Sequence, residues 1–283
     1  MLAARPKTLP AALSPVIVGS AVALAEDRFN LIVGIAAVAV ALLLQIGANF
    51  ANDVADFRSG ADTEHRLGPT RVTQSGLLTP RQVEVATAVT LALAAIPGLY
   101  LVWQGGWVFA VVGLLAIAAA VAYTAGPAYG YVGLGDIAVF LFFGPVAVAG
   151  TAYLMTHQLT ALSLLSSIPM GCLITAILVI NNLRDIDTDR AAGKMTLAVR
   201  LGRSGARTEY ALLLGLSYLV PLMVWLNGLA SFWVLLSFVT APLAVMLLQR
   251  VYTVEGRALN PVLAGTARLC LFFALAYAAG IVL

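Results

Sequence analysis

Charged residues are scarce in this chain of 283 residues. Lysine, arginine, aspartate and glutamate together make up 10% of it, whereas 61% is hydrophobic and the mean hydropathy is +0.96. Soluble domains carry about a quarter of their residues as charges, so this composition excludes a soluble globular protein. We therefore expect an integral membrane protein surrounded by the lipid bilayer, with no nucleic acid among its partners.

Cysteine and histidine are almost absent as well, with two of each. Cys172 and Cys270 lie singly inside apolar runs, which excludes a disulfide framework and a metal centre built on thiolates. His65 and His157 stand far apart and show no metal-ligand spacing. A cleavable secretion signal is not expected either, because the basic residues 5–7 lead directly into the first apolar run. Any bound metal must therefore be held by oxygen ligands.

Long apolar runs dominate the sequence. A helix needs about 20 residues to cross roughly 30 Å of hydrocarbon, and nine runs of about this length follow one another. We expect an all-α fold with nine transmembrane helices, forming a single domain over residues 1–283. The expected spans are 10–25, 31–51, 82–103, 107–124, 135–155, 163–183, 207–226, 231–249 and 262–283.

The cations are distributed unevenly between the two sides of this nine-span arrangement. Only Arg28 falls on one side, and Arg268 lies inside the last span, where we expect it to be buried and paired as a structural clamp or a substrate contact. Because cytoplasmic loops carry an excess of Lys and Arg, we expect a multi-pass protein of the cell inner membrane with a cytoplasmic N-terminus. The cations on the cytoplasmic side are Arg5, Lys7, Arg58, Arg66, Arg71, Arg81, Arg184, Arg190, Lys194, Arg200, Arg203, Arg207, Arg250 and Arg257.

Two polar clusters stand at the ends of apolar runs on that same side. Positions three and four apart are neighbours on a helix surface, so the members of each cluster share one helix face, from which Asp187 is excluded. Carboxylates at the end of a membrane helix are costly and indicate a functional site. We expect the two clusters to face each other. The first contains Asn49, Asn52, Asp53 and Asp56, and the second contains Asn181, Asn182, Asp185 and Asp189.

Four carboxylates brought together in this way need counter-charge. Like charges at such distances do not all stay ionised, and a donor set made only of oxygen favours a hard cation. Mg²⁺ is the best match, because it combines one or two carboxylates with phosphate oxygens of a substrate. The nearby cations Arg66, Arg71, Arg190 and Lys194 then balance a polyanion. A diphosphate docked beside apolar helices implies a lipid tail.

Two polar loops on this side add further candidates. The segment 57–81 mixes glycine, proline and spaced arginines, and it suits a flap in which Arg66 and Arg71 bind phosphate oxygens; the alternative is that these arginines only set the orientation in the membrane. The segment 123–136 contains three tyrosines and Asp136 but no Lys or Arg. It could line a pocket for an aromatic molecule or a carbocation, or it could form an interfacial aromatic belt.

The pattern Asn52-Asp53-x-x-Asp56 followed by Asp185-x-x-x-Asp189, on nine helices, resembles the UbiA superfamily of intramembrane prenyltransferases. Within it, the menaquinone branch, the 1,4-dihydroxy-2-naphthoate polyprenyltransferases, is the most similar. Two departures stand out: Gly60 occupies a position where the superfamily often has a third aspartate, with Asp62 nearby, and Asn182 stands where Asp53 stands in the first motif. The branch resemblance is carried by residues 5–10, 51–53, 68–71, 127–136, 181–194 and 260–261.

The resemblance implies a helical bundle around a central cavity. It implies Mg²⁺-dependent transfer from polyprenyl diphosphate to 1,4-dihydroxy-2-naphthoate, with loss of the carboxylate, giving demethylmenaquinone. Other acceptors, such as 4-hydroxybenzoate or homogentisate, remain open. The implied metal ligands are Asp53, Asp56, Asp185 and Asp189, and the implied catalytic residues are these four together with Tyr123 and Asp136. The implied contacts are Arg66, Arg71 and Lys194 to the diphosphate, Tyr123, Tyr129 and Asp136 toward the acceptor, and Asn49, Asn52, Asn181 and Asn182 beside the substrate.

A secondary transporter is the alternative from a different functional class. Such a protein would use the two Asn/Asp stretches as ion sites near the midplane of the bilayer. Here both stretches lie at helix ends on one side of the expected membrane, and this placement favours an interfacial enzyme site. The continuous signature of the alcohol-transferring lipid phosphotransferases is absent from the sequence.

Overall fold

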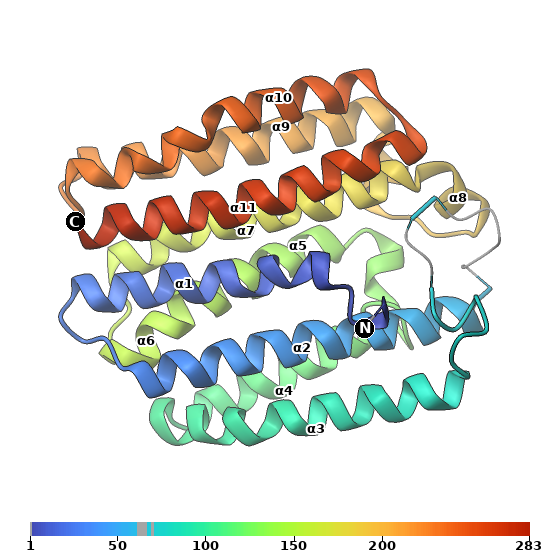
Figure 1. Cartoon of the computed structure of the whole chain (residues 1–283), viewed down its shortest axis with the longest axis horizontal. Coiled ribbons are helices and arrows are strands. Elements are labelled where there is room, and N and C mark those ends of the chain that lie inside the picture. The colour runs from blue at the N-terminus through green and yellow to red at the C-terminus, as the bar shows by residue number, and fades with distance from the viewer. Residues whose placement is uncertain (1, 61–66, 69–70) are drawn as a thin grey trace.

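The computed structural model describes residues 2–60, 67–68 and 71–283, and every regular element in that part of the chain is helical (Figure 1). Seven of its helical segments are long and apolar enough to cross a membrane, and two shorter apolar helices, α1 (Leu9–Ala25) and α4 (Trp107–Ala122), accompany them. The described residues thus contain nine apolar helical segments, and the all-α multi-span prediction is confirmed.

The seven longer segments include single helices and composite ones. Four are single: α2 (Leu31–Arg58), α3 (Pro80–Gly105), α7 (Ala161–Arg184) and α9 (Leu197–Leu226). Three are composite: α5 (Gly135–Leu141) with the π-helical η4 (Phe142–Ala149) and α6 (Gly150–Thr156); η5 (Phe232–Thr240) with α10 (Ala241–Thr253); and η6 (Gly256–Leu259) with α11 (Asn260–Val282). The short elements are η1 (Leu2–Ala4), η2 (Pro6–Thr8), η3 (Tyr129–Val132) and α8 (Ile186–Ala191).

Several of the long helices, α2, α3 and α7 among them, begin at a capping side chain. Asn30 accepts from the backbone N–H groups of Ile32 and Val33 at the start of α2. Thr79 and Thr160 each form a capping box, at α3 and α7 respectively. Capping satisfies backbone donors that the first helical turn leaves without partners. These three helices therefore start at defined residues rather than fraying into the preceding connections.

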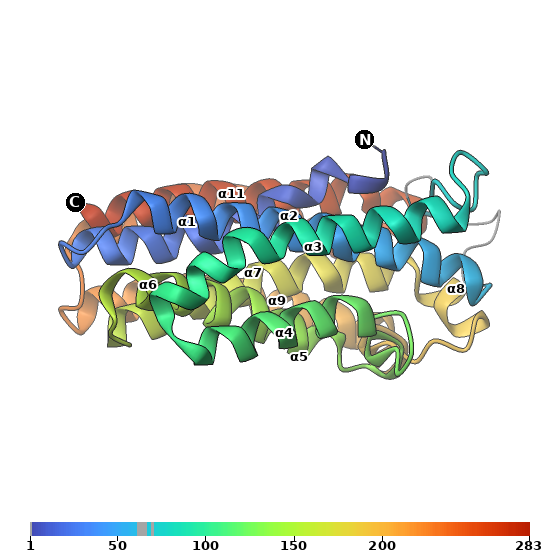
Figure 2. The same cartoon turned by 90° about the horizontal axis from the view of Figure 1, so that it is seen from below.

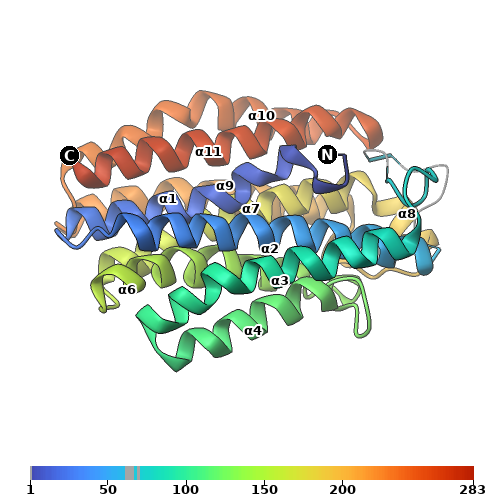
Figure 3. The same cartoon turned by 60° about the horizontal axis from the view of Figure 1, so that its bottom comes forward.

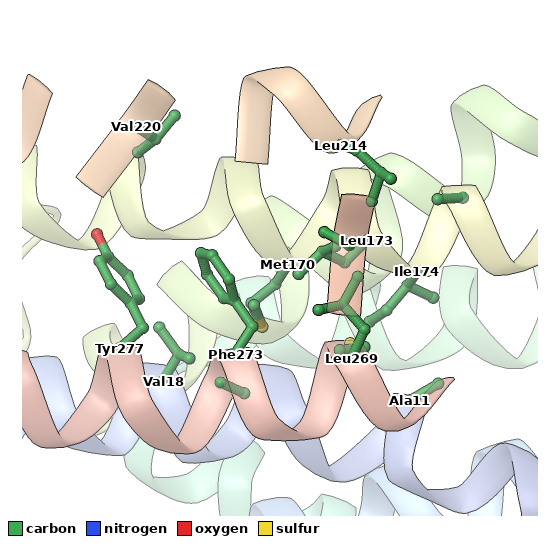
Figure 4. Packing of buried hydrophobic residues seen from close by; sticks show 14 of the residues in the cluster. Ala11, Val18, Met170, Leu173, Ile174, Leu214, Val220, Leu269, Phe273 and Tyr277 are labelled. Atoms are coloured by element: carbon green, nitrogen blue, oxygen red, sulfur yellow. The ribbon is translucent and has the colours of Figure 1, made fainter. Parts of the chain in front are cut away.

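The core of the bundle lies between α7 and its neighbours α1, α9 and α11. Figure 4 shows Met170 and Leu173 of α7 packed against Leu269 and Phe273 of α11. Helices α3 and α4 lie at the edge of the bundle (Figure 3). Close approach relies on small residues, as is usual between membrane helices: a Cβ added to Gly144 of η4 would lie 2.9 Å from the backbone oxygen of Ser167 in α7.

Most of the polar connections lie at one end of the molecule. In Figures 1 and 2 that end carries α8 and the α2–α3 and α7–α9 connections, whereas the C-terminus and the α1–α2 turn lie at the other end. The cation-rich loops of the sequence therefore share one end of the bundle. The two acidic motifs are at this end, as the charge pattern predicted.

Four details differ from the sequence expectation. Helix α2 continues through its whole polar motif to Arg58, and α9 begins at Leu197, before the apolar run, with a non-helical Gly202 at φ 72°. A helix need not end where its apolar residues end, because its backbone hydrogen bonds are formed within the helix whatever its side chains are. Asp185 separates α7 from α8, so the second motif is not one helix. Arg268 is exposed on the outside of α11, so the expectation that it is buried is wrong.

Candidate functional site

The two acidic motifs meet around the side chain of Lys194, which lies in the turn after α8. Its Nζ donates to Asp56 Oδ1 at 3.1 Å and lies 4.0 Å from Asp189 Oδ1. Asp56 belongs to the last turns of α2, and Asp189 belongs to α8. One ammonium group thus contacts carboxylates that are more than 130 positions apart in the sequence. The expected convergence of the clusters is confirmed.

Asp56 is the most heavily contacted carboxylate of the site. Arg71 forms a buried ion pair with its Oδ2, and the hydroxyl of Tyr131 donates to its Oδ1. Lys194 also lies over the ring of Tyr131, 4.3 Å from the centroid, in a cation–π contact. Asp56 is only 4% exposed. Two cations and a hydroxyl group therefore compensate this buried charge.

Asp53 has a different environment, although it is only three positions away. Its Oδ2 accepts from the backbone N–H of Val72 at 3.2 Å, and its Oδ1 accepts from that of Thr73 at 3.0 Å. The carboxylate is 1% exposed. Asp53 therefore fixes the loop that carries Arg71, and Arg71 in turn reaches Asp56. Both carboxylate oxygens of Asp53, which the sequence predicts to be a metal ligand, therefore accept hydrogen bonds from the backbone of this loop.

A buried arginine organises the second motif. The Arg184 guanidinium binds both oxygens of Asp185, at 2.8 and 2.5 Å, and donates to Asn181 Oδ1 at 2.9 Å. It also donates to Asn260 Oδ1 at 2.9 Å, and the amide nitrogen of Asn260 donates to the backbone oxygen of Leu67 at 3.0 Å. This network connects the end of α7 with the start of α11 and with the loop after the first motif.

Three carboxylates of this region act on one another. Burial raises the pKa of Asp189 to about 7; Lys194 lowers it, and the neighbouring Asp185 and Asp56 raise it further. Burial is the main cause, so the raised pKa reflects the cost of an ionised carboxylate at this buried position. A further cation would favour the ionised carboxylate.

The donor chemistry is compatible with Mg²⁺, provided that a substrate completes the coordination. Within the described part of the chain, no three His, Cys, Asp or Glu side chains form a ready-made metal cluster. Mg²⁺ rarely uses such a cage, because it combines one or two carboxylates with water and phosphate oxygens. Asp189 offers oxygen ligands, and Asp56 and Asp185 would offer theirs after exchanging part of their contacts with Arg71, Lys194 and Arg184.

The tyrosines take distinct positions. The rings of Tyr123 and Tyr129 meet edge to face, with centroids 5.4 Å apart. The Tyr129 hydroxyl donates back to Ala119 of α4 at 2.9 Å, and burial raises its pKa to about 12. Tyr123 lies within electrostatic reach of Asp136, Asp189 and Asp56. Of the two predicted tyrosines, Tyr123 is therefore the one that is near the carboxylates.

The predicted asparagines connect structural elements. Asn49 donates to the backbone oxygen of Ala4 at 3.0 Å and to Thr8 Oγ1 at 3.1 Å, which fixes the N-terminal segment against α2. Asn52 accepts from Thr124 Oγ1 at 2.8 Å, and Asn182 is buried. Asn181 belongs to the Arg184 network described above. Arg66, also predicted to bind the diphosphate, lies outside the described residues. Asp187 is exposed and paired with Arg203, in agreement with its predicted position off the shared helix face.

Sequence reasoning missed Tyr131 and the role of Arg184. Tyr131 lies in the same loop as the two predicted tyrosines, Tyr123 and Tyr129. No spacing rule indicates which tyrosine ring of an irregular loop faces Asp56. The signal for Arg184 was present, because a cation between Asn181 and Asp185 in an apolar helix end requires a partner.

Comparison with known proteins places these features in context. The model of the UbiA prenyltransferase family matches residues 12–275. The chain is 42% identical to a 1,4-dihydroxy-2-naphthoate octaprenyltransferase of Mycobacterium tuberculosis over 97% of this chain and 94% of that protein. It is 40% identical to the protein of the same name from Escherichia coli, over 99% of this chain and 93% of that protein.

Solved structures share the fold at low sequence identity. A UbiA homolog from Aeropyrum pernix superimposes with a TM-score of 0.75 at 18% identity, covering 96% of this chain and 97% of that one. A UbiA homolog from Archaeoglobus fulgidus, bound to GPP and Mg²⁺, gives a TM-score of 0.68 at 16% identity, covering 99% and 97%.

Proposed function

This chain belongs to the UbiA prenyltransferase family, and from that premise we propose that it transfers a polyprenyl group from polyprenyl diphosphate to 1,4-dihydroxy-2-naphthoate. The names of the relatives that are about 40% identical over nearly the whole chain support the choice of acceptor. The observation that carries the proposal is the convergence of Asp56 and Asp189 on Lys194. It creates one mixed-charge site at the end of an apolar bundle.

The binding roles follow from the contacts. Asp56, Asp185 and Asp189 would hold Mg²⁺, which when bound would neutralise the diphosphate as it leaves. Arg71 and Lys194 would bind phosphate oxygens after exchanging part of their contact with Asp56. Asp53 would keep the Arg71 loop in place. The prenyl chain would lie along the apolar helices.

The reaction then divides into bond breaking and bond forming. The C1–O bond of the prenyl diphosphate breaks, and the diphosphate leaves with the electron pair. The face of the Tyr123 ring would shield the resulting allylic cation. The ring carbon that bears the carboxylate forms a bond to C1, and loss of CO₂ returns the electron pair to the ring. The product is the reduced form of demethylmenaquinone.

We further propose that residues 1–283 act as one catalytic domain of the cell inner membrane, with the N-terminus and the site at the cytoplasmic face. The excess of Lys and Arg at the site end supports this orientation. Accessibility of single cysteines introduced at exposed positions of the two ends, in oriented vesicles, tests it. Labelling of the site end from the periplasmic side would contradict the proposed orientation.

The test of function is a transfer assay with the purified protein in detergent. The assay supplies Mg²⁺, a labelled polyprenyl diphosphate and, in separate reactions, 1,4-dihydroxy-2-naphthoate, 4-hydroxybenzoate and homogentisate. We expect prenylated product and CO₂ only with dihydroxynaphthoate, and loss of activity on chelation of Mg²⁺. Transfer to hydroxybenzoate or homogentisate, with none to dihydroxynaphthoate, would overturn the proposed acceptor.

A further inference from the structure

Tyr131 takes no part in the proposed bond-breaking and bond-forming steps, yet three of its groups contact the proposed site. Its hydroxyl donates to Asp56 Oδ1. The face of its ring lies 4.3 Å from the Lys194 ammonium nitrogen, measured to the ring centroid. Its backbone oxygen accepts from the N–H of Met195 at 2.7 Å. Tyr131 therefore contacts the first acidic motif and, at the same time, the turn that follows the second motif.

Backbone contacts bring the ring and the ammonium group together. Lys194 directly precedes Met195, and its own N–H donates to the backbone oxygen of Asp189 at 2.8 Å, so the turn is held on both sides of the lysine. Gly133, in the same loop as Tyr131, approaches this turn closely, because a Cβ added there would lie 3.3 Å from the Met195 backbone oxygen. The two loops are thus fixed against each other, and the position of the ring under Lys194 follows from their backbones.

The ammonium group of Lys194 needs partners, because only 13% of its side chain is exposed and a charge removed from water is costly unless it is compensated. Asp56 is its nearest partner, at 3.1 Å. In the proposed function, Asp56 gives up part of this contact to bind Mg²⁺. The face of an aromatic ring does not compete for Mg²⁺, which prefers oxygen ligands. The attraction between the Tyr131 ring and the ammonium group therefore persists when Asp56 binds the metal.

We propose that Tyr131 is a positioning residue for Lys194: its ring keeps the ammonium group in the site while Asp56 binds the metal, so that Lys194 is placed to bind the substrate diphosphate. This inference rests on the proposed function. The hydroxyl of Tyr131 has a separate task, because it donates to the same oxygen of Asp56 as Lys194 does. The two tasks can be separated by substitution: Tyr131→Phe removes the hydroxyl alone, whereas Tyr131→Leu removes the hydroxyl and the ring.

The small number of lysines makes a direct test possible, because the chain has only two, Lys7 and Lys194. An amine-reactive reagent is applied without substrate, and mass spectrometry of the peptides gives the labelling rate of Lys194 by itself. We expect Tyr131→Leu to raise this rate about 5- to 30-fold, the range that corresponds to a largely desolvated cation–π contact. Tyr131→Phe, which keeps the ring, should leave the rate nearly unchanged.

The matched control is Tyr129→Leu, which removes a second tyrosine from η3. The ring of Tyr129 meets Tyr123 rather than Lys194, so the labelling rate of Lys194 should not change. An equal rise in Tyr129→Leu and Tyr131→Leu would overturn the inference, because loosening of the loop would then explain both results. An unchanged rate in Tyr131→Leu would overturn it as well.

Binding of an unreactive prenyl diphosphate analogue with Mg²⁺ tests the link to the substrate. In the unaltered protein the analogue should slow the labelling of Lys194, because its ammonium group then contacts phosphate oxygens. The dissociation constant should rise about 5- to 30-fold in Tyr131→Leu and by less in Tyr131→Phe; an equal rise in both would overturn the role of the ring. If the unaltered protein does not bind the analogue, the proposed function fails and the diphosphate part of the inference with it, whereas labelling without substrate still decides whether the ring holds Lys194.

Discussion

The assignment of Asp53 as the anchor of the Arg71 loop gives a quantitative prediction. In Asp53→Asn, one carboxylate oxygen becomes an NH₂ group that faces a backbone N–H, so one of the two bonds to Val72 and Thr73 is lost. Bonds to a charged group contribute about 1.5–3 kcal/mol each, and the site is 1% exposed, so solvent does not screen them. The loop should open more easily by about 2 kcal/mol, or roughly 30-fold.

Two measurements follow from that number. Trypsin cleavage after Arg71 requires the loop to open, so its rate should rise by about 30-fold when reclosing is fast. In the transfer assay, kcat/KM for the prenyl diphosphate should fall by less than this factor, because it follows the fraction of molecules in which the loop is closed and Arg71 is in place. The Mg²⁺ concentration for half-maximal activity should change little.

The matched variant is Asp56→Asn, which alters a carboxylate three positions away that we assign to the metal. It should raise the Mg²⁺ requirement strongly and leave the Arg71 cleavage rate less affected. If Asp53→Asn instead raises the Mg²⁺ requirement as much as Asp56→Asn does and leaves trypsin cleavage unchanged, Asp53 is a metal ligand and our assignment is wrong.

Three further predictions concern other parts of the structure. Arg184→Lys should lower kcat/KM by about 10- to 100-fold, because an ammonium group cannot bind Asp185 bidentately and reach Asn260 as well. Steady-state kinetics measure this effect, and an unchanged kcat/KM would contradict the proposed role of the Arg184 network. Tyr131→Phe removes the hydroxyl donor but keeps the ring under Lys194, so activity should fall about tenfold; a complete loss in the same assay would show a further role for the hydroxyl. Gly144→Ala should lower the unfolding temperature in detergent, because the added methyl group costs about 1–3 kcal/mol of folding free energy. Gly113→Ala, in which the added methyl group meets no neighbour, should leave it unchanged. Equal melting curves for the two variants would refute the close approach of Gly144 to α7.

The sequence was sufficient to predict the bundle and the convergence of the motifs. Hydropathy defines the spans because each helix must satisfy its own backbone in lipid, and the distribution of cations fixes which ends lie together. Those two facts placed Asp56 near Asp189 without any structural information.

The partners of individual side chains could not be predicted in the same way. Asp53 and Asp56 share a helix face by spacing, yet the loop covers only Asp53, and loop conformation has no periodicity to reveal it. The break at Asp185 coincides with its bonds to Arg184, one of whose other partners is Asn260, far along the chain. Arg268 was expected to be buried because it lies inside the last apolar span, but an arginine at a helix surface can extend its long side chain toward the interface.

The hydrogen bond between Arg184 and Asn260 has a consequence for biogenesis. Its two partners are 76 positions apart, and chains are synthesised from the N-terminus. When both acidic motifs have been synthesised and inserted in the membrane, Asn260, the residue that completes their alignment, has not yet been translated. Nascent chains arrested before α11 should therefore contain every proposed metal ligand and still be inactive.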